Sequence, residues 1–219
     1  MQKRYKTVIF DLDGTLLNTL EDLQTSVNYA LSAYKMPERS IEEIRHFVGN
    51  GVQRLMELAV PCGTSEETLN AAFLLFKKHY AVHCNDKTDL YPGIHELLVQ
   101  LKREGFRTAI VSNKLQEGVD ALYEQYFKEN VEVAIGAREG ICKKPAPDSV
   151  FAAMKLLNAT ADKTIYIGDS EVDIATARNA GLPCITVTWG FRTRKEQEAA
   201  GGKLFADTPE EILKMLNDN

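Results

Sequence analysis

Short runs of apolar residues rich in valine and isoleucine recur along the chain, and segments with helical spacing of apolar positions separate them. Runs of this length that do not alternate with polar residues are typical of strands buried on both faces of a parallel sheet. We therefore predict strands at each of these runs, the last of them the weakest. They cover Thr7–Phe10, Thr108–Val111, Thr164–Ile167, Cys184–Val187 and Val131–Ile135.

The segments between the runs predict helices. Apolar residues of Ile94–Arg103 lie at helical spacing, and Gly105 follows as a stop signal. Val150–Leu157 and Ile174–Ala180 show the same pattern, and Gly181 ends the second of them. Strands and helices that alternate in this way indicate an α/β fold with a parallel sheet covered by helices.

One long region breaks the alternation. From about Leu20 to Val82 the sequence favours helices and contains no convincing strand. Because this block follows the first strand and its acidic turn, we expect it to lie over the carboxyl end of the sheet, where open α/β sheets bind ligands. We predict a core of residues 1–18 and 86–219 and an inserted helical cap of residues 19–85. The cap helices are predicted at Leu20–Tyr34, Ile41–Phe47, Val52–Val60 and Ser65–Val82.

Composition narrows the classes of function. The 219 residues are 44% hydrophobic, which suits one compact core or a core with a smaller module. A net charge of −5 without a clustered basic face argues against nucleic-acid binding. No apolar stretch reaches the roughly 18 residues of a membrane span, and the apolar run after the basic start is too short for a signal peptide. Four widely spaced cysteines predict free thiols in a reducing cytoplasm.

The first strand ends in the stretch KTVIFDLDGTLLNT, which places Asp11 and Asp13 directly after buried apolar residues. A turn that begins at Asp11 can bring both side chains toward one pocket. Gly14 can adopt backbone angles that other residues resist, Thr15 adds a hydroxyl, and exposed amides in such a turn can hold anionic oxygens. By itself the pattern also fits an ordinary turn after a strand.

Three further polar clusters follow strands or precede helices. Val111–Lys114 brings a hydroxyl, an amide and a cation, Lys143–Pro147 places a lysine before a proline, and Gly168–Asp173 brings carboxylates. With the opening pair, these clusters supply carboxylates for a hard cation and hydrogen-bonding or positive groups for an anion.

The combination resembles the haloacid dehalogenase superfamily, and the resemblance covers nearly the whole chain. The motifs match in order at Asp11–Thr15, Ser112–Asn113, Lys144 and Gly168–Asp173. The resemblance implies a Rossmann-like core with an inserted cap. The helical insert and further stretches are similar to the phosphoglycolate phosphatase-like branch in particular; these stretches are Phe47–Gly51, Tyr91–Gly93, Ser112–Lys114 and Thr188–Gly190.

This resemblance implies roles for the catalytic residues. Asp11 would be the nucleophile and form an aspartyl-phosphate. Asp13 would protonate the leaving oxygen and then activate water. Ser112 and Lys144 would hold the transferring phosphoryl oxygens, on which positioning and charge neutralisation do most of the catalytic work. Asn113 would shape the same loop, and with Gly14 and Thr15 it belongs to the predicted substrate-binding residues.

The resemblance also implies a Mg²⁺ ion, held by Asp11, by Asp169 and by the backbone carbonyl of Asp13. Asp173, one helical turn after Asp169, is a weaker candidate, either through a water molecule or as support for the ligands. The alternative for Asp173 is an exposed carboxylate in the first turn of a helix, where the helix dipole favours a negative charge.

The expected activity is a Mg²⁺-dependent phosphatase for a small phosphorylated metabolite. Asn50, Arg54 and Lys114 could face a substrate carboxylate or a second phosphate, which leaves both phosphoglycolate and inorganic pyrophosphate open. A sugar-phosphate phosphatase or phosphomutase, and a non-catalytic phosphate-binding protein on the same fold, are the alternatives. We expect no membrane or nucleic-acid partner, and either a monomer or a homodimer.

Overall fold

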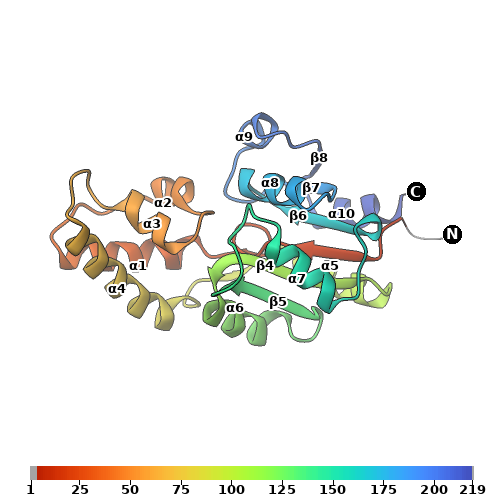
Figure 1. Cartoon of the computed structure of the whole chain (residues 1–219), viewed down its shortest axis with the longest axis horizontal. Coiled ribbons are helices and arrows are strands. Elements are labelled where there is room, and N and C mark those ends of the chain that lie inside the picture. Colours follow the sequence, from red (N-terminus) through yellow and green to blue (C-terminus); the bar gives the residue numbers. More distant parts are fainter. Residues whose placement is uncertain (1–3, 219) are drawn as a thin grey trace. The chain divides into compact units, whose positions relative to one another are not determined.

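The computed structural model describes residues 4–218, and the chain divides into two compact units (Figure 1). The core unit comprises the chain up to Leu17 and from Leu90 onward, and the helical unit is Asn18–Asp89. The short strands β2 (Leu17–Asn18) and β3 (Asp89–Leu90), which the sequence pattern did not predict, pair with each other where the chain passes between the units. The helical unit therefore begins and ends slightly outside the predicted range 19–85.

The core unit contains a parallel sheet of 6 strands in the order β5-β4-β1-β6-β7-β8. This confirms the predicted α/β fold and adds a strand, β8, that the apolar pattern did not predict. Because β1 lies between β4 and β6, the strand order changes direction beside β1, which is where open α/β sheets bind ligands. The strands are β1 (Thr7–Phe10), β4 (Arg107–Leu115), β5 (Val133–Ala137), β6 (Thr164–Gly168), β7 (Cys184–Val187) and β8 (Leu204–Ala206).

Helices cover both faces of this sheet. Val8 and Phe10 of β1 belong to one buried cluster, which includes residues of α5 (Ile94–Arg103), α6 (Gln116–Leu122) and α10 (Pro209–Asn217). Ile9 belongs to a second cluster, with residues of α7 (Asp148–Leu156) and α8 (Glu171–Asn179). Since each face of β1 is fully buried, its sequence is continuously apolar rather than alternating. A π-helical turn (Tyr123–Phe127), a 3₁₀ turn (Ala161–Lys163) and α9 (Arg194–Ala199) complete the unit.

Strand β4 is longer than the apolar pattern predicted. The prediction ended at Val111, with Ser112 and its neighbours after the strand, but β4 continues to Leu115 with a shift of register against β5. Gly136 of β5 leaves space for this continuation, because a Cβ atom there would lie 2.8 Å from the carbonyl oxygen of Lys114 in β4. The polar residues of this cluster therefore lie inside an irregular, buried stretch of strand.

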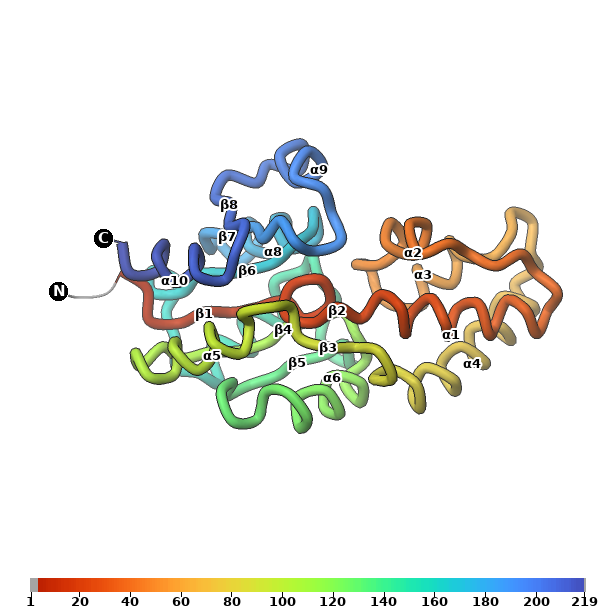
Figure 2. The backbone as a smooth tube through the Cα atoms, turned by 180° about the vertical axis from the view of Figure 1, so that it is seen from behind, coloured from red at the N-terminus to blue at the C-terminus, as the bar shows by residue number. Residues whose placement is uncertain are grey.

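The helical unit contains the four predicted helices (Figure 2). Its core is made by buried residues of all four, including Leu31, Ile44, Met56 and Phe76. The buried carboxylate of Asp22 accepts hydrogen bonds from the end of the unit, at Lys87 and Thr88. The helices are α1 (Leu20–Ala33), α2 (Ile41–Phe47), α3 (Val52–Ala59) and α4 (Glu66–His83). Of the helices within residues 4–218, none is both long and apolar enough to cross a membrane.

Candidate active site

The turn after β1 brings the first aspartate to the edge of the sheet. The backbone amide of Asp11 continues the ladder to β6 by donating to the carbonyl of Ile167 (2.9 Å). The chain then folds back at once, because the amides of Leu16 and Leu17 both donate to the carbonyl of Leu12. Gly14 has a φ of +89°, and a Cβ atom there would lie 2.6 Å from a carboxylate oxygen of Asp169. A glycine is thus required both by the backbone angle and by the closeness of the carboxylate.

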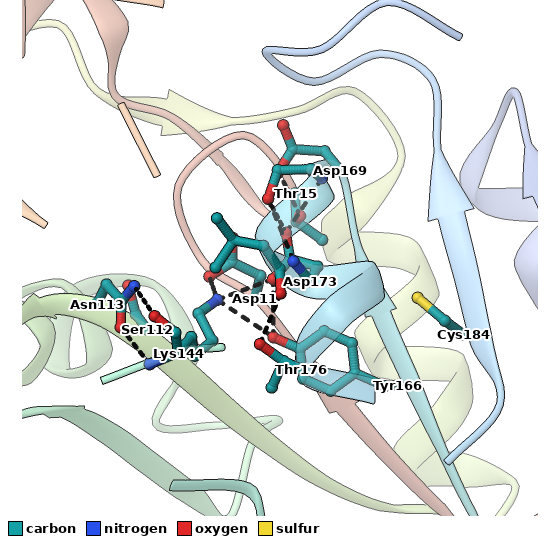
Figure 3. A network of polar contacts seen from close by, with 12 residues as sticks. Asp11, Thr15, Ser112, Asn113, Lys144, Tyr166, Asp169, Asp173, Thr176 and Cys184 are labelled. Carbon is teal, nitrogen blue, oxygen red and sulfur yellow. Dashed lines mark hydrogen bonds and ion pairs between the residues drawn. The ribbon is translucent and has the colours of Figure 1, made fainter. Parts of the chain in front are cut away.

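Lys144 is the centre of the buried polar network (Figure 3). Its ammonium donates to Oδ1 of Asp11 (2.6 Å) and to Oδ1 of Asp173 (2.9 Å), and it reaches the hydroxyl of Tyr166 at 3.2 Å. Burial by itself would lower the pKa of Lys144, but the carboxylates of Asp11 and Asp173 raise it above its usual value. Lys144 is therefore a permanent positive charge beside the predicted nucleophile.

Asn113 holds the loop that carries Lys144. Its side-chain amide donates to the carbonyl of Lys144 (3.0 Å), and its side-chain oxygen accepts from the amide of the same residue (2.8 Å). These two hydrogen bonds resemble those between paired strands, and they connect β4 to the loop. In this loop the peptide bond between Lys144 and Pro145 is cis. The contacts of Asn113 agree with its predicted role in shaping the loop, and its contact with substrate stays a prediction.

Asp169 follows β6 and is held from several sides. Its Oδ1 accepts from the hydroxyl of Thr15 (3.2 Å) and its Oδ2 from the amide of Phe191 (2.7 Å). Burial, and then the charge of Asp173, raises the pKa of Asp169 to about 7. Thr15, predicted to bind substrate, thus uses its hydroxyl to orient a predicted metal ligand.

Asp173 is fully buried, so the alternative of an exposed helix carboxylate is wrong. It caps α8, because its Oδ2 accepts from the amide and the hydroxyl of Ser170 (3.1 and 2.6 Å) while its Oδ1 binds Lys144. Burial acts to raise the pKa of Asp173, but Lys144 and Ser170 lower it below its usual value. Asp173 therefore remains charged and supports Lys144. Its binding of a metal ion stays a prediction.

Asp13 lies in the turn after β1 and has a lysine of its own. The ammonium of Lys114 lies 3.3 Å from Oδ1 of Asp13, and the Lys114 side chain is only 3% exposed. The backbone amide of Lys114 donates to the hydroxyl oxygen of Ser112 (3.1 Å). The O–H of Ser112, a buried residue at the same edge of the sheet, can then donate to a bound anion.

Three carboxylates at this edge fit a divalent cation. Oxygen atoms of Asp11, Asp169 and Asp173 lie within 4.8 Å of one another, and within residues 4–218 they form the only such group of at least three. Burial, and then the charge of Asp173, raises the pKa of Asp11 well above its usual value. A hard cation would relieve this repulsion, and a donor set made only of oxygen atoms is the one that Mg²⁺ prefers.

Tyr166 is a site residue that sequence reasoning missed. It lies in the middle of β6, and its hydroxyl donates to Oδ1 of Asp173 (2.9 Å) and accepts from Lys144. A tyrosine between Ile165 and Ile167 in a buried strand could have indicated a polar partner, because buried tyrosine hydroxyls are usually hydrogen-bonded. Asn50 lies between α2 and α3 of the helical unit, and its contact with substrate stays a prediction.

Comparison with known proteins assigns the family. The haloacid dehalogenase-like hydrolase family matches residues 8–187. A phosphoglycolate phosphatase from Colwellia psychrerythraea is 33% identical over 215 residues, which cover 95% of this chain and 95% of that protein. Another from Vibrio parahaemolyticus is 31% identical over 98% of this chain and 97% of that protein.

A solved structure shows the same fold over nearly all of the chain. It is a crystal structure of a candidate phosphoglycolate phosphatase from Lactobacillus delbrueckii, with a TM-score of 0.94 and 35% identity, covering 99% of this chain and 100% of that chain. The family that the sequence motifs predicted is confirmed. This protein belongs to the haloacid dehalogenase-like hydrolases and is an enzyme of the phosphoglycolate phosphatase-like branch.

Proposed function

We propose that this protein is a Mg²⁺-dependent phosphatase that hydrolyses a small phosphorylated metabolite, with 2-phosphoglycolate as the first candidate substrate. The observation that carries the proposal is the contact of Lys144 with Asp11 at 2.6 Å, in a buried site that also holds Asp169. A nucleophilic carboxylate beside a fixed cation and hydrogen-bond donors is the arrangement that phosphoryl transfer needs.

The reaction proceeds in two steps on the two aspartates of the β1 turn. In the first, a carboxylate oxygen of Asp11 attacks phosphorus, the bond from phosphorus to the leaving oxygen breaks, and that oxygen takes a proton from Asp13. In the second, Asp13 takes a proton from a water molecule whose oxygen attacks the aspartyl-phosphate. Inorganic phosphate leaves and Asp11 is regenerated. Asp13 therefore acts as the general acid in the first step and as the general base in the second.

The remaining residues bind and orient the phosphoryl group. Lys144 and Ser112 neutralise and hold its oxygens, on which the transition-state charge is spread. Asp11, Asp169 and the carbonyl of Asp13 would hold Mg²⁺, which when bound supplies further neutralisation of the phosphoryl charge. Asn113, Thr15 and Asp173 act on these groups rather than on substrate.

Substrate choice rests on the relatives, which carry the name phosphoglycolate phosphatase. Inorganic pyrophosphate and sugar phosphates are the competing substrates of the same chemistry. A role for Asn50 toward the leaving group, a cytoplasmic location and a monomeric or homodimeric state stay predictions. The four cysteines are free thiols in the structure, which is compatible with a reducing compartment.

The test pairs a substrate panel with the Asp11→Asn variant. Purified protein with Mg²⁺ is assayed on 2-phosphoglycolate, pyrophosphate and glucose phosphates, ranked by kcat/KM. We expect phosphoglycolate to rank first and Asp11→Asn to lose at least 10³-fold in kcat, because an amide of the same shape is a poor nucleophile. The far-ultraviolet circular dichroism and melting curve must show that the variant folds. Substantial turnover by a folded Asp11→Asn protein would refute the nucleophile, and a different first substrate would refute only the substrate.

A further inference from the structure

The two aspartates of the β1 turn each contact a different lysine. Asp11 contacts Lys144 from the loop before α7, whereas Asp13 contacts Lys114 from β4. We predicted from the sequence that Lys114 contacts the substrate. In the structure its ammonium contacts Asp13, the predicted acid–base residue. We propose that Lys114 is a positioning residue for Asp13, and that it fixes the carboxyl group where it exchanges protons with the leaving oxygen and with water. This inference rests on the phosphatase function proposed above.

Lys114 is built as a fixed support rather than as a mobile arm. Its backbone amide donates a hydrogen bond to the hydroxyl of Ser112. Its side chain is 3% exposed, so the aliphatic stem cannot move freely in solvent as that of a surface lysine does. The stem lies against Gly118 of α6, where a Cβ atom would lie 3.3 Å from the Cε of Lys114. A glycine inside a helix costs about 1 kcal/mol relative to alanine, and the space that it leaves for Lys114 accounts for its presence.

Asp13 needs such a support more than Asp11 does. Its side chain is 15% exposed, whereas the Asp11 side chain is 10% exposed and bound at 2.6 Å. The contact between Lys114 and Asp13 is 3.3 Å, longer than a charge-assisted hydrogen bond of about 2.8 Å. A contact of that length orients the carboxyl group and leaves its oxygen atoms able to meet a leaving oxygen or a water molecule.

The test compares Lys114→Met and Lys114→Arg on three phosphate esters. Methionine keeps an unbranched apolar stem over Gly118 and removes the charge, and arginine keeps the charge. The esters are 2-phosphoglycolate, ethyl phosphate and p-nitrophenyl phosphate. The first two release an alkoxide oxygen that must be protonated, whereas nitrophenolate departs without a proton. The quantity compared is kcat/KM, which reports the steps up to release of the leaving group.

For Lys114→Met we expect kcat/KM to fall at least ten-fold on both alkyl esters and less than three-fold on p-nitrophenyl phosphate, because only the alkyl esters need the acid. On the aryl ester, Lys114→Met should lower kcat and KM together. The reason is that Asp13 must activate the water molecule that cleaves the aspartyl-phosphate, whichever ester formed that intermediate. Lys114→Arg should recover most of the loss. As a matched control, Lys143→Met removes an exposed lysine of the neighbouring loop and should change no kcat/KM by more than two-fold.

Other outcomes overturn the inference. A loss confined to phosphoglycolate would make Lys114 a contact for the substrate carboxylate, and an equal loss on all three esters, with a lower melting temperature, would make it structural. If the wild-type enzyme rejects phosphoglycolate but hydrolyses the other two esters, the proposed substrate fails while the ethyl and nitrophenyl pair still decides the role of Lys114. If it hydrolyses none of them, the phosphatase function and the role of Lys114 both fail.

Discussion

At the scale of single residues, the site consists of buried charges that are matched one to another. Lys144 lies between Asp11 and Asp173, and a lone buried charge of either sign would cost several kcal/mol. The surroundings also separate the carboxylates by role. Lys144 and Ser170 lower the pKa of Asp173, which keeps it an anion, whereas burial and the charge of Asp173 raise the pKa of Asp11 well above its usual value. A cation is therefore most useful next to Asp11, where phosphoryl transfer is proposed.

Tyr166 provides a prediction at this scale. Tyr166→Phe removes the hydroxyl that links Asp173 to Lys144 but keeps the ring that fills the core. Because both partners are charged and buried, we expect the free energy of unfolding to fall by about 1.5–3 kcal/mol. We also expect kcat to fall several-fold at unchanged KM, since Lys144 would lose an orienting contact. Urea unfolding and steady-state kinetics measure the two effects.

Tyr123→Phe is the matched control for this prediction. The Tyr123 hydroxyl donates to the backbone carbonyl of Val131 at 2.8 Å, in the same unit but with an uncharged partner. Its loss should cost about 1 kcal/mol and leave kcat unchanged. A drop in kcat of the same size in both variants would show that Tyr166 acts only through stability.

At the scale of elements, the loop after β7 holds the β1 turn and the end of β6 together. The indole N–H of Trp189 donates to the carbonyl of Thr15 (3.1 Å), and the amide of Phe191 donates to Asp169. Gly190 between them allows the close approach, because a Cβ atom there would lie 2.3 Å from the Cβ of Asp169 and 2.4 Å from the carbonyl oxygen of Gly14. Backbone and fixed side-chain atoms cannot move aside as the end of a flexible side chain can.

Gly190→Ala should therefore disturb both stability and metal binding. We expect a loss of about 1–3 kcal/mol in the free energy of unfolding, which is typical of an overpacked site. Mg²⁺ affinity should fall at least ten-fold, as measured by calorimetric titration, because Asp169 is displaced. Gly118→Ala is the control: its Cβ would crowd only the stem of Lys114, which is not among the proposed metal ligands, so Mg²⁺ affinity should not change. Wild-type Mg²⁺ affinity in Gly190→Ala would contradict this account of the loop.

At the scale of the whole molecule, the core unit brings together carboxylates from the ends of two central strands and the start of α8. This arrangement is unfavourable without a cation, since burial and the charge of Asp173 together raise the pKa of Asp169 to about 7. Folding therefore assembles a site with unbalanced negative charge, and a bound cation should stabilise the folded protein.

We expect Mg²⁺ to raise the melting temperature of the wild-type protein and a chelator to reverse the rise. At a free concentration of about 100 times Kd, binding to the folded state alone adds about 2.7 kcal/mol. Asp169→Asn should abolish the rise, because an amide is a poor ligand for a hard cation. Scanning calorimetry with and without Mg²⁺ measures it for both proteins. If Mg²⁺ raised the melting temperature of Asp169→Asn as much as that of the wild type, the ion would bind elsewhere than at the proposed ligands.

The sequence by itself determined the fold class and the order of the chemical groups. Continuous apolar runs predict strands buried on both faces, and helical spacing predicts the helical block, because both are local consequences of which side chains must avoid water. Strand β8 and the extension of β4 past Val111 were missed. The first lacks a strong apolar pattern, and the second depends on Gly136 in another strand.

Only the tertiary structure decided which groups meet. Lys144 and Asp11 are 133 positions apart, and Lys114 and Asp13 are 101 apart. Their contacts follow from β1 lying between β4 and β6, an order that periodicity does not encode. The structure therefore pairs Lys114 with Asp13, while its predicted contact with substrate stays a prediction. It also shows that Asp173 is the buried support of Lys144 rather than a surface carboxylate. The physical reason is that periodicity reports how each segment meets water, whereas a site depends on how distant segments meet one another.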